Sequence, residues 1–182
     1  MYASPYTPEF CSWAFAYERH VDRYNPTPTP GVQQRLGAGA GFVAPNPVPD
    51  WPGVDVMLTH GPPHGVFDRV VPGGGNVGCE NLMRAVRRAR PRVHVFGHIH
   101  EGYGAGRMDW GTGQVREIKG DPEEVLEERG VVVDATENGE GGELRFGEET
   151  LFVNASVVTV RYDAVNAPWV VDLDLPVADA DS

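Results

Sequence analysis

The sequence predicts an α/β fold built around two parallel strands that are joined by a helix. Residues 54–58 and 93–96 are short apolar segments that are rich in Val, as buried strands are. Between them, residues 78–90 place apolar side chains at helical spacing. A strand, a helix and a strand within about 45 residues are typical of a right-handed crossover, so we expect the two strands to be parallel.

The length and composition favour one loop-rich domain. The chain has 182 residues, which is enough for a single domain with a sizeable core. Its 23 Gly and 16 Pro residues predict long loops. The 26 acidic residues outnumber the 15 basic ones and give a formal net charge of -11, which repels a phosphate backbone. Nucleic acid is therefore excluded as a main partner.

The sequence predicts neither a disulfide framework nor a membrane segment. The two cysteines, Cys11 and Cys79, are far apart and lack the spacing of metal ligands. The N-terminus lacks a basic start followed by an apolar stretch, and no segment reaches about 18 uninterrupted apolar residues. We therefore expect a cytoplasmic protein without a membrane partner.

Two segments of the first half have an unusual composition. Residues 1–15 are rich in aromatic and apolar side chains, so we expect this stretch to lie inside the folded domain. Residues 25–53 contain seven prolines and five glycines, which a helix or a central strand does not tolerate. We predict that residues 25–53 form a long loop insertion.

The helix predicted at 78–90 has the pattern of an amphipathic helix that packs on a sheet. Pro91 follows it and ends it. Arginines gather in its last turns, where positive charge interacts favourably with the helix dipole. Its apolar positions are Cys79, Leu82, Met83, Val86 and Ala89.

The second half predicts an acidic insertion and then two strands. Residues 106–149 are acidic and Gly-rich, and within them 122–128 favour a short helix and 130–135 a short strand. After the insertion, two strands are expected at 151–163 and 169–176, joined by a turn at 164–168.

Three histidines follow the two strands of the central unit. His60 comes after the first strand, and His98 and His100 come after the second. Because ligands gather beyond the carboxyl ends of parallel strands, we expect the three side chains to meet at one edge of the sheet. Imidazole is a common ligand of transition metals, and His-x-His places both rings on one side of an extended segment. Chance spacing of structural histidines is the alternative, and it is the interpretation we favour for His94 inside the second strand.

The segments around these histidines resemble a known family. They read THGPPHG at 59–65, VFGHIHEGYG at 95–104 and LFVNASVVTVRY at 151–162. The sequence is similar to the calcineurin-like metallophosphoesterases, and most similar to the subgroup of metallophosphoesterase-domain proteins and their fungal relatives.

The resemblance implies a fold, a reaction and a set of site residues. The expected fold is an αββα sandwich. The expected reaction is hydrolysis of a phosphodiester or phosphomonoester, possible substrates including cyclic nucleotides, at a centre of two divalent ions (Mn, Fe or Zn). By resemblance His60 and His98 bind the second ion and His100 binds the first. Asn154 and Ser156 are expected to support the site, with a purely structural role as the alternative.

The chain departs from the family pattern in one large respect. The family motifs Asp-x-His, Gly-Asp and Gly-Asn-His, which supply the remaining ligands and a catalytic histidine, have no counterpart in the expected order. The resemblance thus implies an N-terminally truncated, C-terminal part of a single domain over 1–182, with a partial metal site and no assigned catalytic residue. We expect little or no phosphodiesterase activity from this chain alone.

Three hypotheses follow. The chain is part of a metal-dependent phosphoesterase, or it is a non-catalytic binding or interaction module derived from the same fold. A third hypothesis, a cupin-like barrel that uses His-x-His, is disfavoured by the helix at 78–90. The oligomeric state stays open, although an exposed sheet edge predicts a tendency to associate.

Overall fold

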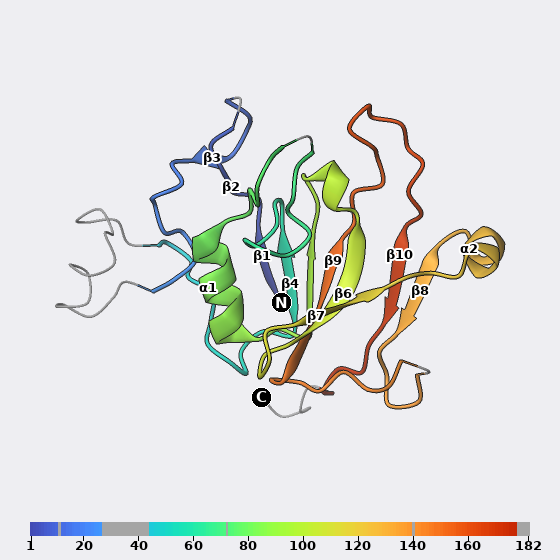
Figure 1. Ribbon diagram of the computed structural model, residues 1–182. Helices are drawn as coiled ribbons and strands as arrows, with labels where there is room; N and C mark the ends of the chain where they lie inside the picture. The colour runs from blue at the N-terminus through green and yellow to red at the C-terminus, as the bar shows by residue number, and fades with distance from the viewer. Residues whose placement is uncertain (11, 27–43, 72, 140, 178–182) are drawn as a thin grey trace.

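The centre of the computed structural model is a six-stranded sheet with the strand order β1, β4, β5, β9, β6, β7 (Figure 1). Strands β1, β4, β5 and β9 are parallel, whereas β6 and β7 are antiparallel to their neighbours. The described residues are 1–10, 12–26, 44–71, 73–139 and 141–177. The six strands are Tyr2–Ser4 (β1), Val56–Thr59 (β4), Val93–Phe96 (β5), Gly104–Asp109 (β6), Val115–Ile118 (β7) and Glu149–Asn154 (β9).

The strand, helix and strand unit predicted from the sequence is confirmed. Strands β4 and β5 are parallel neighbours, and helix α1 (Glu80–Ala89) connects them. The Cys79 sulfur caps the helix by accepting a hydrogen bond from the Leu82 amide at 3.3 Å. Arg90 ends the helix in the left-handed conformation, with φ of 45°.

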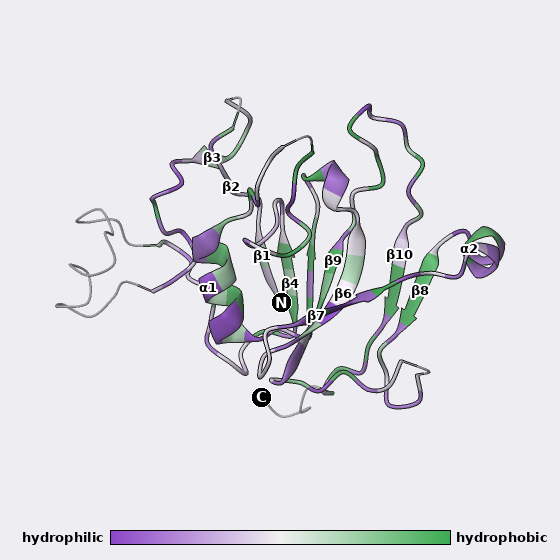
Figure 2. Ribbon diagram, viewed as in Figure 1, coloured by the Kyte–Doolittle hydropathy of each residue, from purple (hydrophilic) through white to green (hydrophobic). Residues whose placement is uncertain are grey.

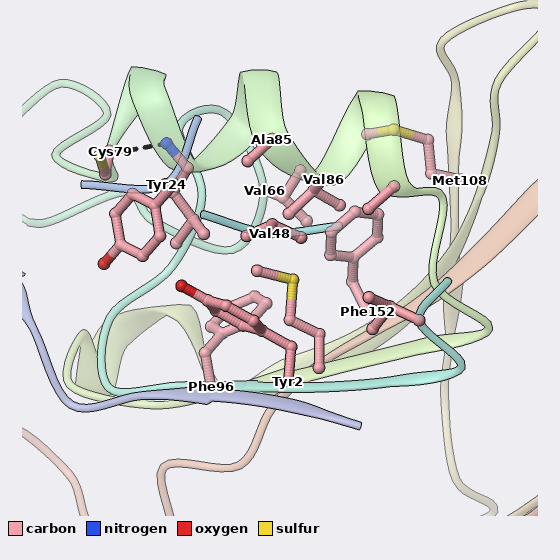
Figure 3. Close-up of a cluster of buried hydrophobic side chains, with 14 of the residues drawn as sticks. Tyr2, Tyr24, Val48, Val66, Cys79, Ala85, Val86, Phe96, Met108 and Phe152 are labelled. Atoms are coloured by element: carbon pink, nitrogen blue, oxygen red, sulfur yellow. Dashed lines mark hydrogen bonds between the residues drawn. The ribbon is translucent and has the colours of Figure 1, made fainter. Parts of the chain in front are cut away.

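Helix α1 covers one face of the sheet (Figures 1 and 3). Its apolar stripe packs on the strands, and its outer side is hydrophilic, as Figure 2 shows. We call this buried cluster the α1-side core. Its largest fully buried members are Tyr24, Val48, Val54, Met57, Val66, Leu82, Val86 and Phe152.

A second, smaller cluster lies on the opposite face of the sheet. It packs against a two-stranded parallel sheet made of β8 (Val131–Asp134) and β10 (Trp169–Asp172). Helix α2 (Pro122–Glu128) precedes β8. Because successive side chains of a strand point to opposite faces, Leu151 of β9 enters this second cluster while Phe152 enters the α1-side core.

Residues 1–15 are only partly interior, so the expectation for this stretch is partly wrong. Tyr2 in β1 is buried. Phe10, Trp13 and Phe15, in contrast, are 61%, 47% and 60% exposed. They lie on the connection between two short parallel strands, Thr7–Pro8 (β2) and Ala16–Tyr17 (β3). Aromatic residues of this stretch therefore lie both in the core and on the surface.

The segment after β9 corrects the strand predicted at 151–163. Strand β9 ends at Asn154, whose side-chain oxygen accepts a hydrogen bond from the Ser156 amide at 3.1 Å and turns the chain. The next strand, β10, belongs to the other sheet rather than pairing with β9. The two strands are therefore separated by a long connection that crosses from one sheet to the other.

The predicted insertions have different outcomes. Residues 106–118 of the acidic segment contribute most of β6 and all of β7 to the main sheet, and the predicted helix and strand within that segment are present as α2 and β8. In the Pro/Gly-rich segment, residues 27–43 lie outside the described residues, as does Cys11. Residues 44–53 form no helix or strand.

The observed architecture agrees with a mixed α/β class and a mostly parallel central sheet. It is not a cupin-like barrel, because the parallel strands form an open sheet with α1 on one face. Over the described part of the chain, no helix is both long and apolar enough to cross a membrane.

Candidate functional site

The ends of β4 and β5 open into a cavity of about 750 Å³. Four segments meet there, at the upper edge of the sheet in Figure 1: the β2–β3 connection, the loop after β4, the turn after β5 and the connection after β9. These segments carry Trp13, His60, His98 and Tyr162 into its lining. The position agrees with the rule that parallel sheets bind ligands at their carboxyl edge.

His60 and His98 contact each other in this cavity. The His60 Nε2 and His98 Nδ1 atoms are 3.1 Å apart and share a hydrogen bond, and the ring centroids are 4.7 Å apart. Backbone hydrogen bonds hold the two loops in register, since the Gly97 amide donates to the His60 carbonyl at 3.0 Å. The parallel pairing of β4 and β5 therefore brings together two histidines that are 38 residues apart.

His98 has an unusual backbone conformation. Its φ is 71°, in the left-handed region that non-glycine residues rarely adopt. Burial lowers the pKa of His98, and the neighbouring His60 and His100 lower it further. Because it combines a left-handed backbone with contact to a second imidazole in a cavity, His98 is a candidate functional residue.

His100 lies in the same cavity, at the start of the 3-10 turn η2 (His100–Gly102). Its Nδ1 donates a hydrogen bond to the Thr159 carbonyl at 3.0 Å. Because Nδ1 carries the proton, the lone pair of Nε2 is available to a cation or a ligand. The rings of Tyr162 and His100 pack edge-to-face, with centroids 5.4 Å apart.

Aromatic side chains pack on two of the histidines. Trp13 packs edge-to-face on His98, with centroids 5.4 Å apart, and Phe10 packs on Trp13 at 5.6 Å. Tyr162, which packs on His100, is 71% exposed. Rings that are this exposed at the mouth of a cavity present flat apolar surface to a ligand.

Asn154 and Ser156 lie beneath this cavity. Asn154 is fully buried and donates hydrogen bonds to the Ile99 carbonyl at 2.9 Å and to the Phe67 carbonyl at 3.1 Å. It therefore joins the loop after β4 to the turn that carries the histidines. Ser156 is also buried, and its hydroxyl has no partner among the described residues.

His94, in the middle of β5, is fully buried away from the cavity. The Thr59 hydroxyl donates to the Gly61 carbonyl at 2.8 Å, so it accepts from His94 Nε2 at 2.9 Å. Burial lowers the pKa of His94 to about 3. His94 is thus a hydrogen-bonded, neutral core residue.

The histidine pair fits two ligands of one metal ion. Nitrogen ligands of a tetrahedral zinc ion, bound at about 2.0–2.1 Å, lie roughly 3.3 Å apart, and the two ring nitrogens of His60 and His98 are 3.1 Å apart. A complete two-ion centre does not fit the described residues. Glu9 and Glu101 also line the cavity, but the described side chains form no group of three or more His, Cys, Asp or Glu able to hold a metal.

The predicted site residues do not include Arg19, Trp13 and Tyr162, which also line this cavity. None of them belongs to the two histidine loops, although Tyr162 ends the segment 151–162 that carries part of the family resemblance. Trp13 and Tyr162 reach the histidines through the β2–β3 connection and the segment after β9, whose course depends on tertiary packing.

Comparisons with known proteins show that the chain is similar to metallophosphoesterase-domain proteins. It is 33% identical over 180 residues to metallophosphoesterase domain-containing protein 1 of Homo sapiens, and equally similar to the Mus musculus protein of that name. A UPF0046 protein of Caenorhabditis elegans is 37% identical over 108 residues, which cover 57% of this chain and 21% of the relative. No family model matches the chain.

The coverage of the two mammalian relatives is unequal. The alignment includes 97% of this chain but only 36% of each relative. The chain thus spans about a third of the length of these two curated relatives.

Proposed function

We infer that the chain belongs to the metallophosphoesterase-domain family, and we propose that it supplies the histidine part of a site for metal-dependent hydrolysis of phosphate esters. The observation that carries the proposal is the contact of His60 Nε2 with His98 Nδ1 at 3.1 Å, at the ends of two parallel strands. His100 would add one imidazole nitrogen from the same cavity.

The donor set supports a transition-metal ion. Imidazole binds several divalent transition metals, so the donor set does not select among Mn, Fe and Zn. A divalent cation at such a site lowers the pKa of a bound water and neutralises charge on phosphoryl oxygens. The residues of this chain would orient the ligands, through the left-handed backbone of His98 and the carbonyl that fixes His100.

The cavity walls favour a phosphate ester that carries a flat group. Trp13 and Tyr162 flank the histidines and remain 47% and 71% exposed. A planar base or aryl ring can stack on such surfaces. A nucleotide, cyclic nucleotides included, is therefore the small-molecule substrate that we propose.

A non-catalytic binding module is the second candidate. It is favoured by the described residues, which bring no group of three or more His, Cys, Asp or Glu together as a metal site. Because no carboxylate of the described residues joins the histidines in such a group, we propose that this chain alone hydrolyses phosphate esters slowly or not at all.

The experiment is a hydrolysis and binding assay on the purified chain. Bis(p-nitrophenyl) phosphate is added with and without Mn²⁺ to wild type and His98→Ala. We expect wild type to hydrolyse the diester no faster than His98→Ala does. We also expect Mn²⁺ to tighten binding of the diester about tenfold or more in wild type only. Binding that Mn²⁺ leaves unchanged would favour the non-catalytic module. Robust Mn²⁺-dependent turnover that His98→Ala abolishes would contradict the partial site.

A further inference from the structure

Arg19 contributes a positive charge to the histidine cavity. It follows β3, and its side chain lines the cavity together with His60, His98 and His100. Among the described residues of this lining, Arg19 is the one Lys or Arg. In a chain with a formal net charge of -11, a cation in the same lining as three imidazoles is the feature of the cavity that attracts an anion.

The hydrogen bonds of Arg19 leave one edge of its guanidinium unused. Nη1 donates to the Gly78 carbonyl at 2.9 Å and to Glu80 Oε2 at 3.1 Å, and Nη2 donates to the Val77 carbonyl at 2.7 Å. A guanidinium has five N–H donors. The Nε hydrogen and the second Nη2 hydrogen therefore have no acceptor among the described residues.

These two N–H groups form the side edge of the guanidinium. The opposite edge is fixed by two consecutive backbone carbonyls, so the side chain is held in place before a ligand arrives. A pair of parallel N–H donors matches two oxygens of a carboxylate or a phosphate. Glu80 compensates the charge only in part, because this ion pair is solvent-exposed, with side chains 47% and 59% accessible.

We propose that Arg19 binds the phosphoryl oxygens of the ligand in the histidine cavity through its Nε and Nη2 edge. The proposal rests on the proposed function for the identity of the ligand. It assigns a division of labour, in which the histidines bind the metal and Arg19 binds the anionic group. Because Arg19 carries its charge without a metal, the interaction can be measured in metal-free protein.

The test is a titration of the metal-free chain with inorganic phosphate, followed by the chemical shifts of the His98 and His100 rings. We expect Arg19→Gln to weaken phosphate binding about tenfold. Arg84→Gln is the matched control: Arg84 has the same 47% side-chain exposure and one ion pair, with Asp22, but does not line the cavity. It should bind phosphate within about twofold of wild type.

A second variant separates anion binding from a structural role. Arg19 also ties the start of α1 to the β3 loop, so Arg19→Gln alone could loosen the cavity. Glu80→Gln removes the competing carboxylate and keeps the carbonyl contacts, so phosphate should bind about two- to threefold tighter. Glu127→Gln, on the distant helix α2, controls for the change in net charge and should have no such effect (Figure 1).

The outcomes separate this inference from the proposed function. Equal phosphate binding by wild type and Arg19→Gln, or no binding by wild type, would overturn the role of Arg19. Glu80→Gln that binds phosphate no more tightly than Glu127→Gln would also overturn it. If wild type bound no metal, or if Mn²⁺ had no effect on diester binding, the proposed metal site would be wrong. The role of Arg19 would still stand, because phosphate binding is measured in metal-free protein.

Discussion

The middle of β5 and the loop after it hold histidines in opposite environments. His94 is fully buried, and its neighbours are the Thr59 hydroxyl and the rings of Phe96 and Phe152. His98 is half-buried in a cavity, has a φ of 71° and contacts a second imidazole. Both residues have a pKa below the usual value, mainly through burial.

The difference shows what distinguishes a structural histidine from one that we propose as a metal ligand. A lowered pKa is common to both, so it does not identify the site. The distinguishing features are the hydrogen-bond partner and the backbone. His94 donates through Nε2 to a hydroxyl whose own proton is used by the Gly61 carbonyl, and its buried Nδ1 has no partner among the described residues. His98, in contrast, shares a hydrogen bond with His60 and retains access to solvent.

The largest effect that would sharpen this comparison is loss of the buried ring. His94→Ala leaves a cavity between Phe96 and Phe152, and we expect it to lower the free energy of unfolding by about 3 kcal/mol. His98→Ala should lower it by less than about 1 kcal/mol, because that ring borders an open cavity. Urea denaturation of both variants measures these two free energies. Equal losses in the two variants would contradict the difference between the buried and the cavity-facing ring.

The pH dependence of stability gives the next effect. Because the folded pKa of His94 is about 3, well below the unfolded value, the unfolded state binds more protons between these values. The stability from neutral His94 is therefore present above about pH 6.5 and is lost as the pH falls toward the folded pKa. His94→Gln keeps an N–H donor for Thr59 and does not titrate. Between pH 6.5 and 4.5, we therefore expect its free energy of unfolding to fall by roughly 2 kcal/mol less than that of wild type.

The measurement is urea unfolding of wild type and His94→Gln at several pH values in that range. Carboxylates titrate in both proteins, so only the difference between the two slopes counts. Identical slopes would mean that His94 is protonated at no cost in the folded state, and its assignment as a neutral core residue would then be wrong.

The smallest of these effects concerns the link between the two regions. Thr59 accepts from His94 and donates to Gly61, which follows the site residue His60. Thr59→Val leaves the His94 N–H buried without an acceptor, so we expect a loss of about 1–2 kcal/mol in unfolding free energy. Affinity for a metal should fall less than about tenfold. Thr59→Ser, which keeps the hydroxyl, is the control and should retain both properties.

The central unit of the fold was predictable because its signals are local. Residues 93–96 and the helix have the period and the stop signals of their class, and the structure places them within two residues of the predicted bounds. β6 was not recognised, since its segment GAGRMD offers two glycines and a buried arginine in place of an apolar alternation. β9 was extended too far because the Asn154 turn is made by a side chain that also fits a strand interior.

The site was predictable only in its histidines. His60 and His98 follow strands that a crossover makes parallel, so sequence position alone suggested that they meet. The separation of His94 from the cavity was predictable from its place inside the strand. Arg19, Trp13 and Tyr162 come from connections whose path no local pattern determines, and they became visible only as neighbours of the histidines.

The proposed metal site is tested most directly by a calorimetric titration of the chain with Zn²⁺, a metal that imidazole binds well. We expect one ion per chain in wild type, an affinity that falls about 100-fold in His98→Ala, and an affinity in His94→Gln within about threefold of wild type. Equal Zn²⁺ binding by wild type and His98→Ala would contradict the claim that the strand-end histidines form a metal site.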